Sequence, residues 1–196
     1  MEIIAHRINT IDQLKNLNTK FGVEVDIRTN KNELVIGHDP FSDYISFNSW
    51  LLEYKHRTLI LNVKEDGLEE ILLLKMEHHN IKNFFLLDQG FPYLIKTLDS
   101  GEKRCSVRFS EYESIDTVIS LKGKVDWVWI DFFKKFPLNS KTYEILKNNN
   151  FKLCIVSPEL QGHSDSACID LRNYLIKNKI VIDAVCTKKL KFWEEC

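Results

Sequence analysis

The chain has 196 residues, of which 44% are hydrophobic and 28% are charged, and its formal net charge is −1. This balance is typical of one globular domain, here expected to span residues 1–196. A net charge so close to zero argues against nucleic acid or an anionic membrane as a partner.

The N-terminal residues and the cysteines bear on location. MEIIAHR lacks the basic and then apolar pattern of a signal peptide, and no run of about 18 apolar residues occurs that would span a membrane. The cysteines are odd in number and no pair is spaced C-x-x-C, which argues against a disulfide framework and a structural zinc site. They are Cys105, Cys154, Cys168, Cys186 and Cys196. We expect a cytoplasmic protein, with no signal for its oligomeric state.

Short apolar runs, often β-branched or aromatic, recur along the chain and predict strands buried on both faces. They are 3–5, 23–27, 59–63, 84–87, 105–107, 125–130, 152–156 and 182–186. One further run, 33–36, follows the second strand across the turn-forming residues TNKN. We interpret it as a hairpin-like insertion.

Amphipathic stretches separate the strands and predict helices over 67–80, 91–98, 114–121, 141–149 and 165–178. In the first of them, Leu68, Ile71, Leu72 and Met76 form an apolar stripe, and Glu69, Glu70 and Glu77 fall outside it. Ser164 or Asp165 is the expected N-cap of the last.

Alternation of strands and helices implies parallel pairing through crossovers. We predict an α/β fold, a single compact (β/α)₈ TIM barrel with short loops and one or two stunted helices, because such barrels usually take about 200 to 250 residues. An open doubly wound sheet is the alternative, but the sequence has neither G-x-G-x-x-G nor a Walker A motif.

Active sites of such barrels lie where strands end and βα loops begin. Nearly every predicted strand carries polar residues at its end, which indicates a lined pocket at one rim. These residues are His6 and Arg7; Glu24, Asp26 and Arg28; Asn62 and Lys64; Asp88 and Gln89; Arg108 and Ser110; Asp131; Ser157 and Glu159; and Thr187 and Lys188.

Glu24 and Asp26 are two residues apart, so both side chains point to one face of a strand. Buried side by side, two carboxylates raise each other's pKa unless a cation lies between them. Oxygen ligands at this spacing suit Mg²⁺ or Ca²⁺ better than zinc. The other interpretation is a structural ion network with Arg7, Arg28 or Lys64.

His6 and His38 supply a general acid and a general base near neutral pH if they flank such a metal. Arg7 and Arg108 have the fork geometry that clamps a phosphate, and Lys64 would neutralise another phosphate oxygen. Glu159 is a candidate contact for a substrate hydroxyl. The alternative interpretation of either histidine is that it lies at the rim of the barrel and has only a structural role.

The stretches IIAHR, FGVEVDIR and ELVIGHDPF closely resemble the glycerophosphodiester phosphodiesterase family, which belongs to the TIM-barrel superfamily of phospholipase-C-like phosphodiesterases. The resemblance is specific over residues 1–40. It implies His6 and His38 as the acid/base pair, Arg7 as a phosphate contact, and Glu24 and Asp26 as metal ligands. LNVKE at 61–65 resembles a later strand of the family.

Two positions depart from the family pattern. Ile8 and Asn9 follow His-Arg where the family usually has glycine, and Asn9 is either a metal ligand or a loop-capping residue. Asn62 stands where the family has a third carboxylate. Its amide oxygen can bind Mg²⁺ or Ca²⁺ but adds no charge, so metal affinity is expected to fall.

The expected function is metal-assisted cleavage of a small phosphodiester, glycerophosphodiester-like or sugar-linked, by acid–base catalysis. A substrate with an adjacent hydroxyl would allow a cyclising, lyase-like outcome. Because of Asn62, a non-hydrolytic phosphoester-binding protein on the same barrel is the main alternative, and isomerisation by the same acid/base pair is a further one.

Overall fold

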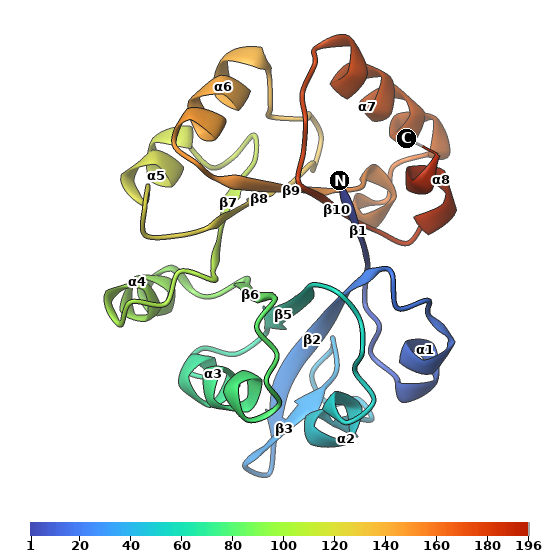
Figure 1. The fold of residues 1–196 in the computed structure, drawn as a ribbon, viewed down its shortest axis with the longest axis vertical. Helices are drawn as coiled ribbons and strands as arrows, with labels where there is room; N and C mark the ends of the chain where they lie inside the picture. The colour runs from blue at the N-terminus through green and yellow to red at the C-terminus, as the bar shows by residue number, and fades with distance from the viewer. Residues whose placement is uncertain (196) are drawn as a thin grey trace. The chain divides into compact units, whose positions relative to one another are not determined.

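The computed structural model describes residues 1–195, which form two compact units (Figure 1). Unit 1 combines Met1–Ile4 with the chain from Glu102 onward, and unit 2 is Ala5–Gly101. Cys196 lies outside the described residues, and the four other cysteines are buried thiols.

Unit 2 contains parallel strands followed by an antiparallel extension. Strand β2 (Gly22–Asn30) pairs in parallel with β5 (Leu59–Val63), and β5 pairs in parallel with β6 (Phe84–Leu87). The last residues of β2 pair antiparallel with β3 (Glu33–Ile36), which pairs in turn with β4 (Ile45–Ser46). All residues of β5 and β6 are buried, as their continuous apolar runs require.

Four helices connect the strands of unit 2: α1 (Ile11–Asn16), α2 (Phe47–Leu51), α3 (Glu69–His78) and α4 (Phe91–Asp99). Neither α1 nor α2 was predicted, because both are too short to show a helical apolar period. A local signal for α1 exists: Thr10 and Gln13 form a capping box, in which each side chain accepts a hydrogen bond from the other residue's backbone N–H.

Helix α3 corrects one prediction about its faces. Ile71, which we placed on the apolar stripe, is 42% exposed, whereas Glu69, which we placed outside it, is only 6% exposed. Burial of Glu69 is tolerated because its carboxylate accepts hydrogen bonds from the Gly67 backbone N–H and from the Gln89 amide. Leu72 and Met76 are buried as expected.

Unit 1 holds strands in the order β1, β10, β9, β8, β7. Neighbours from β7 to β10 pair in parallel, and their bounds are β7 (Ser106–Phe109), β8 (Trp127–Ile130), β9 (Lys152–Val156) and β10 (Ala184–Thr187). Strand β1 (Glu2–Ala5) opens the chain. Trp127 and Trp129 are both buried, so they belong to the core.

The helices of unit 1 are α5 (Ile115–Ser120), α6 (Ser140–Asn148), the 3₁₀ helix η1 (Pro158–Gln161), α7 (Asp165–Lys177) and α8 (Leu190–Glu194). Within this unit, α5, α6 and α7 lie on one side of the strands (Figure 1). Ser164 is the N-cap of α7. No helix within residues 1–195 combines the length and apolar character that crossing a membrane requires.

The α/β class predicted from the sequence is confirmed, since parallel strands alternate with helices in both units. The bounds of 59–63, 84–87 and 152–156 are identical to those of β5, β6 and β9. The further run 33–36 has the bounds of β3. The other five predicted strands differ at their ends, where hydrogen bonding rather than side-chain pattern decides the last residue.

Candidate active site

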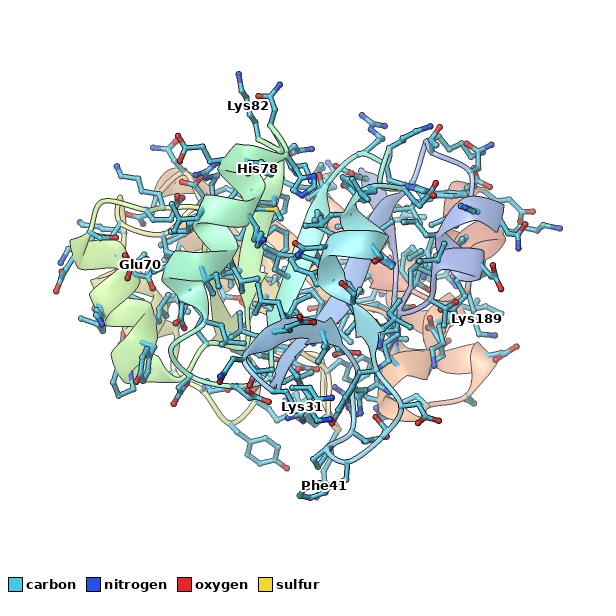
Figure 2. All side chains as sticks on the ribbon, turned by 90° about the horizontal axis from the view of Figure 1, so that it is seen from below. Lys31, Phe41, Glu70, His78, Lys82 and Lys189 are labelled. Carbon is cyan, nitrogen blue, oxygen red and sulfur yellow. The ribbon has the colours of Figure 1, made fainter. Side chains whose placement is uncertain are left out.

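The predicted acid/base and metal-binding residues all belong to unit 2 and gather around the ends of its strands. Glu24 and Asp26 lie on the same face of β2, and each is 0% exposed. In the parallel ladder, Asp26 is the partner of Asn62 on β5. Figure 2 shows Lys31 and Phe41, from the β2–β3 turn and the loop after His38, at one end of the unit, and His78 and Lys82 at the other end.

Glu24 is held by neutral donors. Its Oε1 accepts a hydrogen bond from Asn62 Nδ2 at 2.8 Å, and its Oε2 accepts one from the Arg7 backbone N–H at 2.7 Å. His6 Nε2 lies 3.9 Å from Oε2. Burial and the nearby Asp26 charge raise the pKa of Glu24 to about 7, and the hydrogen bonds only partly oppose them.

Asp26 is surrounded by cations and by Asn9. Lys64 Nζ lies 3.1 Å from Oδ1, and Arg7 Nε lies 3.7 Å from Oδ2. Asn9 Nδ2 donates to Oδ2 at 2.7 Å, while Asn9 Oδ1 accepts from the Asp26 backbone N–H at 3.1 Å. Both ends of the Asn9 amide are therefore engaged by one residue, which favours the loop-capping role over metal ligation.

Arg7 joins the carboxylates to His38. Its φ of 54° lies in the left-handed region, which is strained for a residue with a Cβ. Its Nη2 atom is hydrogen-bonded to His38 Nε2. Because a guanidinium only donates, Nε2 carries the lone pair, and the ring proton is on Nδ1, which faces Asp39 Oδ1 at 2.8 Å.

The donor set in this cluster fits a hard divalent cation. Glu24 and Asp26 offer carboxylate oxygens, and the buried Asn62 Oδ1 has no hydrogen-bond partner within the described chain. A cation there would also lower the pKa that burial raises at Glu24. No three His, Cys, Asp or Glu side chains of residues 1–195 group as metal ligands. The unpartnered Asn62 Oδ1 is therefore the candidate for a third protein oxygen.

Arg108 and Glu159 belong to unit 1. Arg108 Nη1 is 2.9 Å from Asp131 Oδ2, and Arg108 Nε is 3.8 Å from Glu113. Asp131 is 2% exposed, and its Oδ1 accepts from Gln161 Nε2 at 2.7 Å. The guanidinium is therefore already oriented by carboxylates, and a phosphate would share it with them.

Glu159 lies at the centre of a network in unit 1. Its carboxylate accepts from the Ser157 hydroxyl, from Thr187 Oγ1 at 2.5 Å, from the Lys188 backbone N–H at 3.0 Å and from Cys168 Sγ at 3.2 Å. Burial acts to raise its pKa, but these hydrogen bonds outweigh burial and lower it. A substrate hydroxyl would have to displace one of these internal donors.

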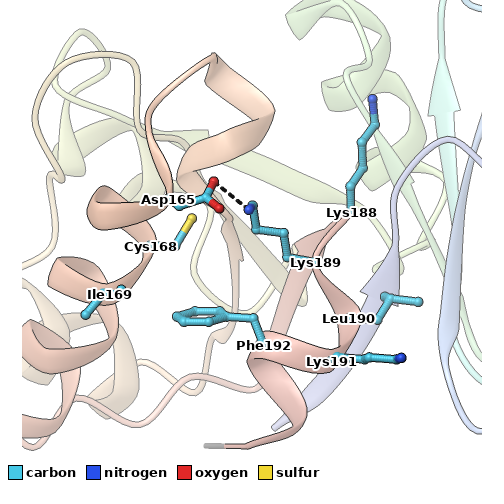
Figure 3. A pocket seen from close by; sticks show the side chains of 8 residues that line it. All are labelled: Asp165, Cys168, Ile169, Lys188, Lys189, Leu190, Lys191 and Phe192. Carbon is cyan, nitrogen blue, oxygen red and sulfur yellow. Dashed lines mark ion pairs between the residues drawn. The ribbon is translucent and has the colours of Figure 1, made fainter.

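A pocket of about 570 Å³ lies in unit 1 between α7 and α8 (Figure 3). Its apolar lining includes Ile169, Leu190 and Phe192, and the Lys189 ammonium is 2.6 Å from Asp165 Oδ1. In Figure 3 the Lys188 side chain extends away from that ion pair. Lys188, one of the polar residues at the predicted strand ends, lines this pocket, whereas the predicted acid/base, metal-binding and substrate-contact residues do not.

Sequence reasoning missed two contacts of the candidate residues. From the sequence we assigned no role to Asp39, yet it is the Nδ1 partner of His38. The signal for it is a carboxylate directly after a candidate acid/base histidine. Gln161, which orients Asp131, has no comparable signal because the two residues are 30 positions apart.

Comparison with solved structures identifies the fold as that of the glycerophosphodiester phosphodiesterases. The enzyme from Agrobacterium tumefaciens str. C58 aligns with a TM-score of 0.68 at 12% identity, over 99% of this chain and 97% of that chain. The glycerophosphoryl diester phosphodiesterase from Parabacteroides distasonis aligns at 0.67 and 10% identity, over 96% and 83%. A structure from Galdieria sulphuraria, assigned to the same group, aligns at 0.73 and 15% identity, over 100% and 98%. No protein-family model and no curated protein matches the sequence.

Proposed function

We propose that this protein, whose fold is that of the glycerophosphodiester phosphodiesterases, is a phosphoric diester hydrolase acting on a small phosphodiester. The observation that carries the proposal is that two histidines contact one buried charged cluster. His6 contacts it through Glu24, and His38 contacts it through Arg7. An acid and a base beside a guanidinium are the groups that cleavage of a phosphodiester needs.

His38 and His6 would divide the proton transfers between them. With Arg7 as the donor to Nε2, His38 carries its lone pair on that nitrogen, which is the form that would accept a proton from an attacking hydroxyl. His6 would then protonate the leaving oxygen. Asp39 would stabilise the imidazolium that forms on His38, because its carboxylate faces Nδ1.

Arg7 and Lys64 are the proposed phosphate contacts within unit 2. Each lies within 4 Å of Asp26, so a bound phosphate would take over part of their interaction with that carboxylate. Arg108 and Glu159, in unit 1, are proposed as a further phosphate contact and a hydroxyl contact, with their internal partners as competitors.

A divalent cation, Mg²⁺ or Ca²⁺, is proposed as the cofactor, held by Glu24, Asp26 and Asn62. When bound, it would polarise the phosphoryl group and lower the pKa of an attacking hydroxyl. The support is the set of buried oxygens and the raised pKa of Glu24. With an amide in place of a third carboxylate, we expect weak binding.

The closed (β/α)₈ barrel and the single domain over residues 1–196 are part of the same proposal. Their support is the alignment of nearly the whole chain with solved structures of that enzyme group, together with the parallel strand and helix alternation of each unit.

The test is a phosphodiesterase assay with glycerophosphodiesters and with bis(p-nitrophenyl) phosphate, each with added Mg²⁺, Ca²⁺ or EDTA. His6→Ala and His38→Ala should each lower kcat by about 10²- to 10⁴-fold. His78→Ala, an exposed histidine of α3, is the control and should leave kcat unchanged. Undiminished activity in both site variants would refute the proposal. ³¹P NMR of the products distinguishes hydrolysis from formation of a cyclic phosphate.

A further inference from the structure

The backbone carbonyl of His38 accepts hydrogen bonds from a side chain of β2. Arg28 donates to this oxygen from both Nε, at 3.1 Å, and Nη2, at 2.9 Å. The Arg28 side chain is only 17% exposed. Two N–H groups of one rigid fork on a single carbonyl fix its direction as well as its distance.

Arg28 is itself anchored. Its Nη1 lies 3.5 Å from Glu65 Oε1, next to Lys64 at the end of β5. The other oxygen of Glu65 accepts from the Thr29 backbone N–H at 3.2 Å and from the Thr29 hydroxyl at 2.5 Å. Glu65 therefore binds two consecutive residues of β2, and the Arg28 fork has one preferred orientation.

The loop after His38 is held from its other side as well. Tyr44 donates from its hydroxyl to the Asp39 carbonyl at 3.1 Å, and Ser42 donates to the same oxygen at 2.9 Å. The Tyr44 ring lies so close to Gly37 that a Cβ there would collide with it. With its backbone fixed on both sides, His38 presents Nδ1 to Asp39 and Nε2 to Arg7.

We propose that Arg28, anchored by Glu65, is a positioning residue that holds the His38 backbone so that the imidazole keeps its tautomer and its aim. This inference rests on the proposed function for its catalytic consequence, and on the contacts above for its structural part. Displacing a catalytic base by about 1 Å lowers the reaction rate on the order of 10²-fold. We therefore expect loss of the Arg28 contact to change kcat rather than KM.

The experiment compares Arg28→Lys and Arg28→Met with the wild type in kcat, KM and the ¹⁵N shifts of the His38 ring. Lysine keeps the charge but lacks the two-pronged donor, and methionine loses both. We expect kcat to fall about 10- to 100-fold in both variants, with KM changed less than threefold. The His38 ¹⁵N shifts should move from one tautomer toward the mixture of a free imidazole.

Arg57→Met is the matched control, because Arg57 is an exposed arginine of the same unit. This substitution should change neither kcat nor the His38 ¹⁵N shifts. Glu65→Gln should give a smaller fall in kcat, and the Glu65→Gln/Arg28→Met double variant should be no worse than Arg28→Met alone, since both act through one contact.

Unchanged kcat and unchanged His38 shifts in Arg28→Met would overturn the inference, as would a loss of melting temperature without either change. If the wild type cleaves no phosphodiester, the proposed function fails. The ¹⁵N shifts still decide whether Arg28 positions His38.

Discussion

Asn62 Nδ2 donates a hydrogen bond of 2.8 Å to Glu24 Oε1 in the interior of unit 2. The contact joins an amide to a fully buried carboxylate, at the position where the motif of the glycerophosphodiester phosphodiesterases has a third carboxylate. It satisfies one oxygen of Glu24 without neutralising its charge. The charge at this position would therefore decide how strongly the proposed cation binds.

Asn62→Asp should strengthen metal binding, because it adds a negative charge with almost no change in size. In EDTA we expect a lower melting temperature than in the wild type, since three carboxylates then repel one another. Added Mg²⁺ or Ca²⁺ should raise the melting temperature of the variant by more than that of the wild type. Thermal unfolding with and without metal measures both effects.

Asn83→Asp provides the control, since Asn83 bonds to Thr58 away from the carboxylate cluster. If added metal raises the melting temperature equally in the wild type, in Asn62→Asp and in this control, Asn62 is not a ligand of the metal.

Glu24 makes the stability of the metal-free protein depend on pH. Its pKa is raised to about 7, whereas an unfolded glutamate titrates near 4.3. Between these values the folded state binds more protons than the unfolded state, so the free energy of unfolding falls as pH rises through this window. Over the whole window the free energy of unfolding should fall by about 4 kcal/mol.

Glu24→Gln should remove this dependence, because the amide does not titrate. Urea unfolding in EDTA from pH 5 to pH 8 measures it. A wild-type stability that rises over this range, or an equal slope in the variant, would contradict the assigned environment of Glu24.

Gly37→Ala should disturb the loop that carries His38. The added Cβ would collide with the Tyr44 ring, so one of the two must move, at a cost of about 1 to 3 kcal/mol. We expect lower stability together with a lower kcat. In the Gly37→Ala/Tyr44→Ala double variant the ring is gone, and the loss of stability should be smaller than the sum of the single losses. Additive losses would mean that the two residues do not interact.

Glu159→Gln should destabilise unit 1. A glutamine has one acceptor oxygen in place of two, so some of the Ser157, Thr187, Cys168 and Lys188 donors lose their partner, at about 1 to 3 kcal/mol for each buried group left unpaired. The lowered pKa of Glu159 means that its carboxylate stabilises the fold above the unfolded pKa, and that this contribution is lost as pH falls through the folded value.

Between pH 7 and pH 3 the melting temperature of Glu159→Gln should therefore fall by less than that of the wild type. Glu144→Gln, on the exposed face of α6, is the comparison and should follow the wild type. If Glu159→Gln is as stable as Glu144→Gln, the network is not structural.

Much of the fold follows from local pattern. The runs that became β5, β6 and β9 are mostly apolar, as expected of strands that are buried on both faces. The Glu24-x-Asp26 spacing places both carboxylates on one face of β2 because strand side chains alternate. His6 and Lys64 were likewise found from their places at the ends of strands, whereas His38 was indicated by the resemblance of its motif to a known family.

Tertiary structure alone decided which partners these residues have. Asn9 reaches Asp26 across 17 positions, and Glu65 reaches Thr29 across 36. Arg28 meets the His38 carbonyl because β2 and β3 pair antiparallel in one register, and a shift of one residue would turn the guanidinium to the other face. The sequence by itself determined the chemical groups and the strands that carry them. Packing decided the charge, the hydrogen-bond partners and the orientation of each group, because burial and long-range contacts set those properties.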